Sequence, residues 1–296
     1  MDALNQWSKR YKSYGDYSVT TLLNSPRQVH LQKRYGSQVI REPEQQVAAF
    51  IGTGVHSMFE ESLRLQAILD PKYEIERTVF DKIQNRLITG KFDILYDNKH
   101  LYDIKTCKVW KKVFDPDLVE WHQQLNMYAW MLRNRGLDIK SINVIAIYMD
   151  WQQQRAFRDD SYPNAPIIEY ELKLWQDDYT EKYINGRIKL MVESETLTDE
   201  QLPFCTAEEM WQRASETTFA VMPKKEATRA SKVFTTMEEA KEYARGKFAS
   251  VPEAFIEVRR PERTRCEHWC DGKDWCSQYK DYSVNKERIL KEIVPI

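Results

Sequence analysis

The chain has 296 residues, of which 42% are hydrophobic and 30% are charged, and its net charge is −1. This length suits one large domain or a core with a smaller module, and the composition is typical of a folded, soluble protein. No apolar run approaches the ~20 residues that a membrane span needs, and the first 15 residues lack the apolar core of a signal peptide. We therefore expect a cytoplasmic protein with no membrane partner. Because the net charge is close to zero, a nucleic acid would have to bind at a local basic patch.

The first half of the chain has the periodicity of an α/β core. Apolar residues recur at helical spacing before Pro71, and three segments then alternate between apolar and polar residues. The expected elements are a helix at 44–69, strands at 73–80, 86–96 and 100–106, a helix at 118–135, and a strand buried on both faces at 142–149.

The second half changes in texture. Residues 151–165 are polar and indicate a loop, residues 169–195 are typical of a helix, and a short helix is expected at about 236–247. From Pro203 the chain carries a basic stretch and a cysteine cluster. We therefore predict a core domain at residues 1–195, including an N-terminal helical segment, and a C-terminal module at residues 196–296.

The segment around Asp97 predicts a β-hairpin with chemistry on one face. Asp and Asn favour turns, so residues 97–99 are taken as a three-residue turn. Asp93 then pairs directly across from Asp103, and Lys105 lies on the same face as Asp103 because side chains alternate along a strand. This pairing depends on the register, since a slip of one residue would separate the two acids.

Two facing carboxylates repel each other unless a cation lies between them. Oxygen ligands of this kind suit Mg²⁺ or Mn²⁺, which can polarise a phosphodiester and activate water. Lys105 could then stabilise the negative charge that develops during attack. The alternative for an isolated Asp-x-Lys is a hairpin with solvated charges.

The residues around this hairpin resemble the RecB-like branch of the PD-(D/E)XK nuclease superfamily over residues 20–150. The resemblance rests on Gly52-x3-His56, Gly90-x2-Asp93, Asp103-Ile104-Lys105-Thr106 and Gln124-x3-Tyr128, in the order of the family. It implies a restriction-endonuclease-like α/β core with a mixed central sheet flanked by helices. The cysteines described below add a cysteine-rich, metal-binding C-terminal module to this fold.

The resemblance also implies roles for residues outside the hairpin. His56 shares a helix face with Phe59 and should point inward, where the family has a metal ligand beside Asp93 and Asp103. Gln124 and Tyr128 form an i,i+4 pair that could hold DNA or the lysine, or could simply pack.

Glu76 could match the acid that many members carry on the first strand, although Glu74 has the same parity. We count Glu76 among the candidate catalytic residues.

The function that the resemblance implies is a metal-dependent DNA nuclease. An exonuclease that processes DNA ends in recombination, repair or phage replication is expected, in a bacterium or a phage-infected cell. Two alternatives remain open: a structure-specific endonuclease, and a non-catalytic DNA-binding protein that kept the fold. No G-x4-G-K-[ST] motif is present, so unwinding would need a partner such as a helicase or a recombination protein.

The C-terminal cysteines indicate a second metal site. Cys266, Cys270 and Cys276 are clustered in a chain without a secretion signal, where thiols more often bind metal than form disulfides. Some RecB-like nucleases hold a [4Fe–4S] cluster with a cysteine just before a Pro-Arg pair, but this chain has Ser25 there. Its tail resembles phage-encoded stand-alone nucleases, which suggests Cys205 as the fourth ligand. Four thiolates satisfy Zn²⁺ or a cubane cluster, and we favour zinc.

A basic stretch lies between these cysteines. It could contact the DNA backbone, or it could be a solvated face. Its members are Lys224, Lys225, Arg229 and Lys232.

Overall fold

The computed structural model describes residues 14–39, 43–213, 215–289 and 293–295. The chain divides into two compact units: unit 1 comprises Met1–Asn24 and Ile40–Glu193, and unit 2 comprises Ser25–Val39 and Ser194–Ile296. The sequence placed residues 25–39 in the core domain, whereas they cluster with the C-terminal unit. The reason is packing, since Leu31 lies in one hydrophobic cluster with Leu202 and Cys276. No described helix combines the length and apolar character that crossing a bilayer requires.

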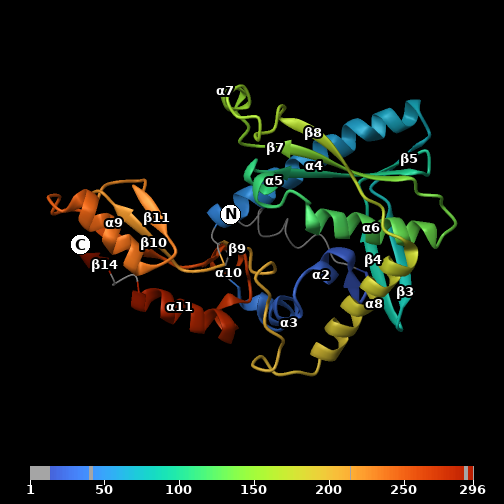
Figure 1. Ribbon diagram of the computed structural model, residues 1–296. Helices are drawn as coiled ribbons and strands as arrows, with labels where there is room; N and C mark the ends of the chain where they lie inside the picture. The colour runs from blue at the N-terminus through green and yellow to red at the C-terminus, as the bar shows by residue number, and fades with distance from the viewer. Residues whose placement is uncertain (1–13, 40–42, 214, 290–292, 296) are drawn as a thin grey trace. The chain divides into compact units, whose positions relative to one another are not determined.

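Unit 1 is a mixed α/β unit with helices packed on its sheets (Figure 1). Its helices are α2 (Val19–Leu23), α4 (Pro43–Leu69), α5 (Trp110–Phe114), α6 (Val119–Arg133), α7 (Gln153–Ala156) and α8 (Asp177–Ser194). Its strands are β1 (Tyr17–Ser18), β2 (Tyr73–Ile75), β3 (Thr78–Ile83), β4 (Arg86–Lys91), β5 (Ile94–Tyr96), β6 (His100–Cys107), β7 (Ser141–Tyr148) and β8 (Ile167–Leu172).

The strands of unit 1 form two sheets. The five-stranded sheet has the order β2-β5-β6-β7-β8, in which β6 and β7 are parallel and the other pairs are antiparallel. The three-stranded sheet has the order β1-β4-β3. Helix α4 packs against β2 and β6, and helix α6 packs against β6, β7 and β3. The α/β class and the mixed sheet expected from the sequence are therefore present.

Two of the predicted strands are each broken in the middle. Residues 73–80 form β2 and β3, and residues 86–96 form β4 and β5. Both breaks occur at one level, because the amide of Glu76 donates to the carbonyl of Asp93 at 2.9 Å. At this level the paired strands leave the five-stranded sheet and enter the three-stranded one.

Other differences lie downstream. The helix expected at 169–195 begins at Asp177, and its first residues belong to strand β8. Strand β8 lies at the edge of the sheet and alternates exposed and half-buried residues. It is hard to recognise from the sequence because Glu169 and Glu171 occupy its exposed face. The loop expected at 151–165 contains the short helix α7.

Unit 2 combines short helices with a small sheet of order β11-β10-β12-β14. Its helical elements are α3 (Pro26–Tyr35), η1 (Gly36–Gln38), α9 (Met237–Phe248), α10 (Thr264–His268), η2 (Lys273–Trp275) and α11 (Ser277–Ile289). Its strands are β9 (Gln212–Arg213), β10 (Thr218–Met222), β11 (Lys232–Phe234), β12 (Phe255–Arg259), β13 (Glu262–Arg263) and β14 (Ile293–Pro295). Val221, Ala240, Ala244 and Ile256 form the core between α9 and the sheet.

Candidate functional site

The hairpin β5–β6 has the pairing register that the sequence predicts. Tyr96 pairs with His100 and Ile94 with Tyr102, around a turn in which Asp97 and Asn98 have φ angles of 51° and 56°. Asp93 precedes β5 and lies outside the ladder, and its Oδ2 accepts a hydrogen bond from the Ile104 amide at 2.7 Å. The carboxylate is therefore anchored against β6, one residue from Asp103.

Three side chains converge at the level where the strands break. His56, Glu76 and Asp93 each offer one ligand atom, and these atoms lie within 4.8 Å of one another. The Nδ1 atom of His56 is 3.6 Å from Oδ2 of Asp93. They come from α4, from the bend after β2, and from the link into β5. One imidazole and two carboxylates form a donor set that suits Mn²⁺ and, through the oxygens, Mg²⁺.

Glu76 reaches this group because its backbone leaves the strand. Its φ angle is 56°, a left-handed conformation that is uncommon for a glutamate and that often marks functional sites. Its carboxylate forms an ion pair with Lys91, a residue that the sequence analysis did not select. Glu74, the alternative acid, points elsewhere and pairs with Arg77 at 2.6 Å. Strand parity could not separate the two acids, because Glu76 is not in the strand.

Asp103 and Lys105 form a second pair beside the group. Asp103 is 2% exposed, and its Oδ2 lies 2.7 Å from Nζ of Lys105. The sequence expected Asp103 as a metal ligand with His56 and Asp93. In the structure Glu76 takes that third place among the clustered donors, and Asp103 holds the lysine.

The electrostatics of the site follow from burial. Desolvation and the charge of Asp103 raise the pKa of Asp93 to about 7. Burial and the charge of Lys105 lower the pKa of His56, which favours the neutral ring that can bind a metal. Burial would lower the pKa of Lys105, but the carboxylates of Asp103 and Asp93 outweigh it and raise that pKa. The site thus holds a charged lysine beside repelling acids.

Gln124 and Tyr128 lie on α6, and Tyr128 is near Asp103 and Asp93. Both are buried, and Nε2 of Gln124 donates to the Tyr128 hydroxyl at 3.0 Å. Burial and the nearby Asp103 raise the pKa of Tyr128. A Cβ atom at Gly90 would lie 2.7 Å from the Tyr128 ring, so glycine is required for β4 to approach α6.

Four of the five cysteines lie in unit 2. Cys205, Cys266 and Cys276 are buried, Cys270 is partly buried, and all are free thiols. Burial raises the pKa of Cys205 to about 11 and of Cys266 to about 12, and the other thiols of the group add to both.

Ser25 lies directly beside this group, since its hydroxyl is 2.9 Å from Sγ of Cys205. The serine that replaces the expected cysteine is therefore next to the proposed substitute ligand. No three of these sulfurs lie within 4.8 Å of one another among the described residues. Tetrahedral Zn²⁺ with Zn–S bonds of about 2.3 Å would bring its sulfurs to ~3.8 Å. Cys107, by contrast, ends β6 in unit 1.

The basic stretch covers the connection between β10 and β11 and the first residue of β11, Lys232. Lys224, Lys225 and Arg229 are exposed there. Lys232 is engaged with aromatic rings, since its Nζ is 5.0 Å from the Phe234 ring centre and 5.6 Å from that of Tyr243.

No family model and no curated protein matches the sequence. Among solved structures, the fold is similar to the crystal structure of SSO0001, with a TM-score of 0.43, 20% identity, and coverage of 64% of this chain and 83% of that chain. It is also similar to the alkaline exonuclease LHK-Exo from Laribacter hongkongensis, with a TM-score of 0.35, 14% identity, and coverage of 60% and 89%. At this distance the likeness concerns the course of the backbone alone, so the chemistry is argued from the residues of this chain.

Proposed function

We propose that this chain is a divalent-metal-dependent deoxyribonuclease with its active site at the strand break of unit 1. The observation that carries the proposal is the convergence of His56, Glu76 and Asp93 beside the Asp103–Lys105 pair. Asp103 affects the pKa of Asp93, so the two groups are electrostatically linked. A structural role would not require buried acids that repel each other.

His56, Glu76 and Asp93 would hold Mg²⁺ or Mn²⁺, and Asp103 would act beside them through its ion pair with Lys105. The cation would polarise a phosphodiester and lower the pKa of a bound water. Lys105 would donate hydrogen bonds to the attacking water or to a phosphoryl oxygen, and Asp103 would hold its ammonium group in place. The Gln124–Tyr128 pair would help to position these acids.

The choice of DNA as substrate follows from the sequence motifs that resemble RecB-like nucleases. We propose an exonuclease acting on DNA ends in recombination, repair or phage replication, with a helicase or recombination protein as partner. The exposed residues Lys224, Lys225 and Arg229 would contact phosphates. A structure-specific endonuclease and a non-catalytic DNA-binding protein are the competing functions.

The test is cleavage of labelled linear DNA and of covalently closed circles, each with Mn²⁺, Mg²⁺ or EDTA. We expect linear DNA to be degraded only with metal, circles to survive, and Asp103→Asn to abolish cleavage while the exposed Asp97→Asn retains it. Degradation of closed circles as fast as linear DNA would favour an endonuclease. Binding without any cleavage would favour the non-catalytic alternative.

We also propose that Cys205, Cys266, Cys270 and Cys276 bind a structural metal centre. The support is that these thiols lie in one unit and raise one another's pKa, and metal binding would offset the raised pKa by displacing the protons. Four thiolates would satisfy the Zn²⁺ favoured from the sequence or the alternative [4Fe–4S] cluster. Elemental analysis of anaerobically purified protein distinguishes iron, zinc and neither.

A further inference from the structure

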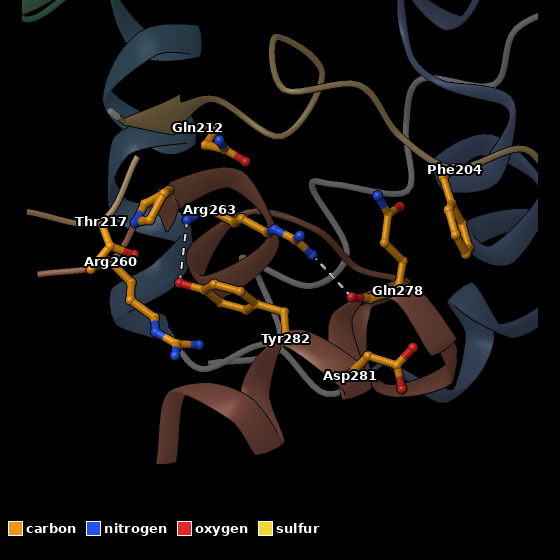
Figure 2. Close-up of a pocket in the computed structure, with 9 residues that line it drawn as sticks. Phe204, Gln212, Thr217, Arg260, Arg263, Gln278, Asp281 and Tyr282 are labelled. Carbon is orange, nitrogen blue, oxygen red and sulfur yellow. Dashed lines mark hydrogen bonds between the residues drawn. The ribbon is translucent and has the colours of Figure 1, made fainter. Parts of the chain in front are cut away.

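Unit 2 contains a surface pocket of about 470 Å³ lined by cationic, aromatic and amide side chains (Figure 2). This volume is in the range of pockets that bind small molecules or single nucleotides. The lining residues that matter for its chemistry are Phe204, Gln212, Thr217, Arg260, Arg263 and Tyr282.

One wall of the pocket is held firmly. The guanidinium of Arg263 lies 4.7 Å from the ring centre of Tyr282, and its Nη1 donates to the carbonyl of Gln278 at 3.1 Å. The Tyr282 hydroxyl donates to Glu267 at 2.5 Å. Figure 2 shows Arg263 linked to Gln278 and Tyr282, so this cation is positioned before any ligand arrives.

Arg260 differs from its neighbours in being available. It is exposed, and within the described part of the chain it has no hydrogen bond, ion pair or ring contact. The adjacent Arg259, by contrast, is paired with Glu257 at 2.7 Å. A cation that borders a pocket without a protein partner favours an anionic ligand such as a phosphate.

The aromatic side chains point to the other part of the ligand. Phe204 is 64% exposed, while the buried Arg27 lies 4.9 Å from its ring centre. Trp211, which precedes the lining residue Gln212, is 41% exposed and has a left-handed φ of 49°. A bulky residue in this conformation is a true outlier, and such strain is tolerated where function requires it. Exposed rings beside cations are the features on which unpaired bases stack.

Asp281 also lines the pocket and would repel a phosphate. It has a polar interaction within the described chain. A phosphate should therefore bind on the side of Arg260.

We propose that this pocket binds single-stranded DNA, with a base stacked on Phe204 and a phosphate bound by Arg260. The choice of DNA rests on the proposed nuclease function. A single strand is expected because duplex bases are already stacked on each other and cannot cover a protein ring. The site would hold a strand on unit 2 independently of the metal group in unit 1.

The test measures binding of the full chain to fluorescein-labelled oligo(dT) by anisotropy in EDTA, where cleavage is absent. We expect Arg260→Gln to weaken binding several-fold and to reduce the slope of log affinity against log salt by about 0.7. Phe204→Ala should weaken binding about ten-fold, with little change in the salt slope. Arg259→Gln, which removes the same charge one residue away, and Trp269→Ala, which removes an exposed ring outside the pocket, are the matched controls.

The proposal is overturned if the chain does not bind oligo(dT), if it binds duplex DNA more tightly, or if Arg260→Gln and Arg259→Gln weaken binding equally. Thermal melting of each variant shows whether it is folded, and Arg260 is exposed enough that its variant should fold if Phe204→Ala does not. Pocket-dependent binding without cleavage would contradict the nuclease function alone. Cleavage with pocket-independent binding would contradict this site alone.

Discussion

Replacing Asp93 with asparagine should stabilise the metal-free protein at neutral pH, although it removes a proposed ligand. Burial and the charge of Asp103 raise the pKa of Asp93 from 3.8 to about 7. Between these pH values the folded protein holds a proton that the unfolded chain has lost, so stability falls as the pH rises. A pKa difference of this size corresponds to up to about 4 kcal/mol at pH 8.

Asparagine has nearly the same shape as aspartate, and its Oδ1 can still accept the hydrogen bond from the Ile104 amide. It lacks the buried charge. We therefore expect Asp93→Asn to melt on the order of 10 °C above the unmodified chain at pH 8 in EDTA, since 1 kcal/mol is worth about 2–4 °C in a unit of this size. The difference should shrink steadily as the pH falls toward 4.

The assay is thermal unfolding of both proteins in EDTA across this pH range, repeated with excess Mn²⁺. Metal should raise the melting temperature of the unmodified chain more than that of Asp93→Asn. The control is Asp97→Asn on the turn of the same hairpin, where Lys99 lowers the pKa of an exposed carboxylate and no gain is expected. Two results would refute this reasoning: Asp93→Asn is less stable than the unmodified chain at pH 8, or its gain in stability does not depend on pH. Either would show that the ionised Asp93 carboxylate does not destabilise the fold.

Three further predictions concern single positions. Gly90→Ala should destabilise unit 1 by about 1–3 kcal/mol in thermal unfolding, because its Cβ would meet Tyr128, whereas Gly54→Ala, with open space around it, should stabilise by about 0.5–1 kcal/mol; equal effects would refute the close approach. Glu76→Gln should raise the Mn²⁺ concentration needed for half-maximal cleavage or binding, and Glu74→Gln should not. The opposite result would identify Glu74, and not Glu76, as the metal ligand. Cys205→Ser should lower the zinc or iron content of anaerobically purified protein, and Cys107→Ser should leave it unchanged; a metal content that Cys205→Ser does not change would show that Cys205 is not a ligand.

The parts of unit 1 that follow local rules could be predicted from the sequence. The helix at 44–69, the strand at 142–149 and the hairpin register follow from hydrophobic periodicity and from the Asp97-Asn98 turn. These signals are local, and the tertiary contacts of unit 1 leave the elements that they predict unchanged.

The role of Glu76 could not be predicted, because it depends on a backbone conformation. A left-handed glutamate interrupts a segment that has the sequence pattern of one strand, and its amide donates a hydrogen bond to the carbonyl of Asp93, which lies between β4 and β5. Neither feature has a sequence signature. The short strands β10 and β11 of unit 2 were missed because they are five and three residues long and give too few alternations to recognise.

The discontinuous make-up of unit 2 has a consequence for how the chain is synthesised. Helix α3 leaves the ribosome early, but Arg27 donates hydrogen bonds to Leu202 and to Ser277, a residue 250 positions later in the chain. Until that late segment has emerged, Leu31 and the guanidinium of Arg27 lack the partners that bury them. Truncation after residue 195 would leave this helix permanently without them, so the shortened protein should aggregate or be degraded through its N-terminal end even though unit 1 is complete in sequence.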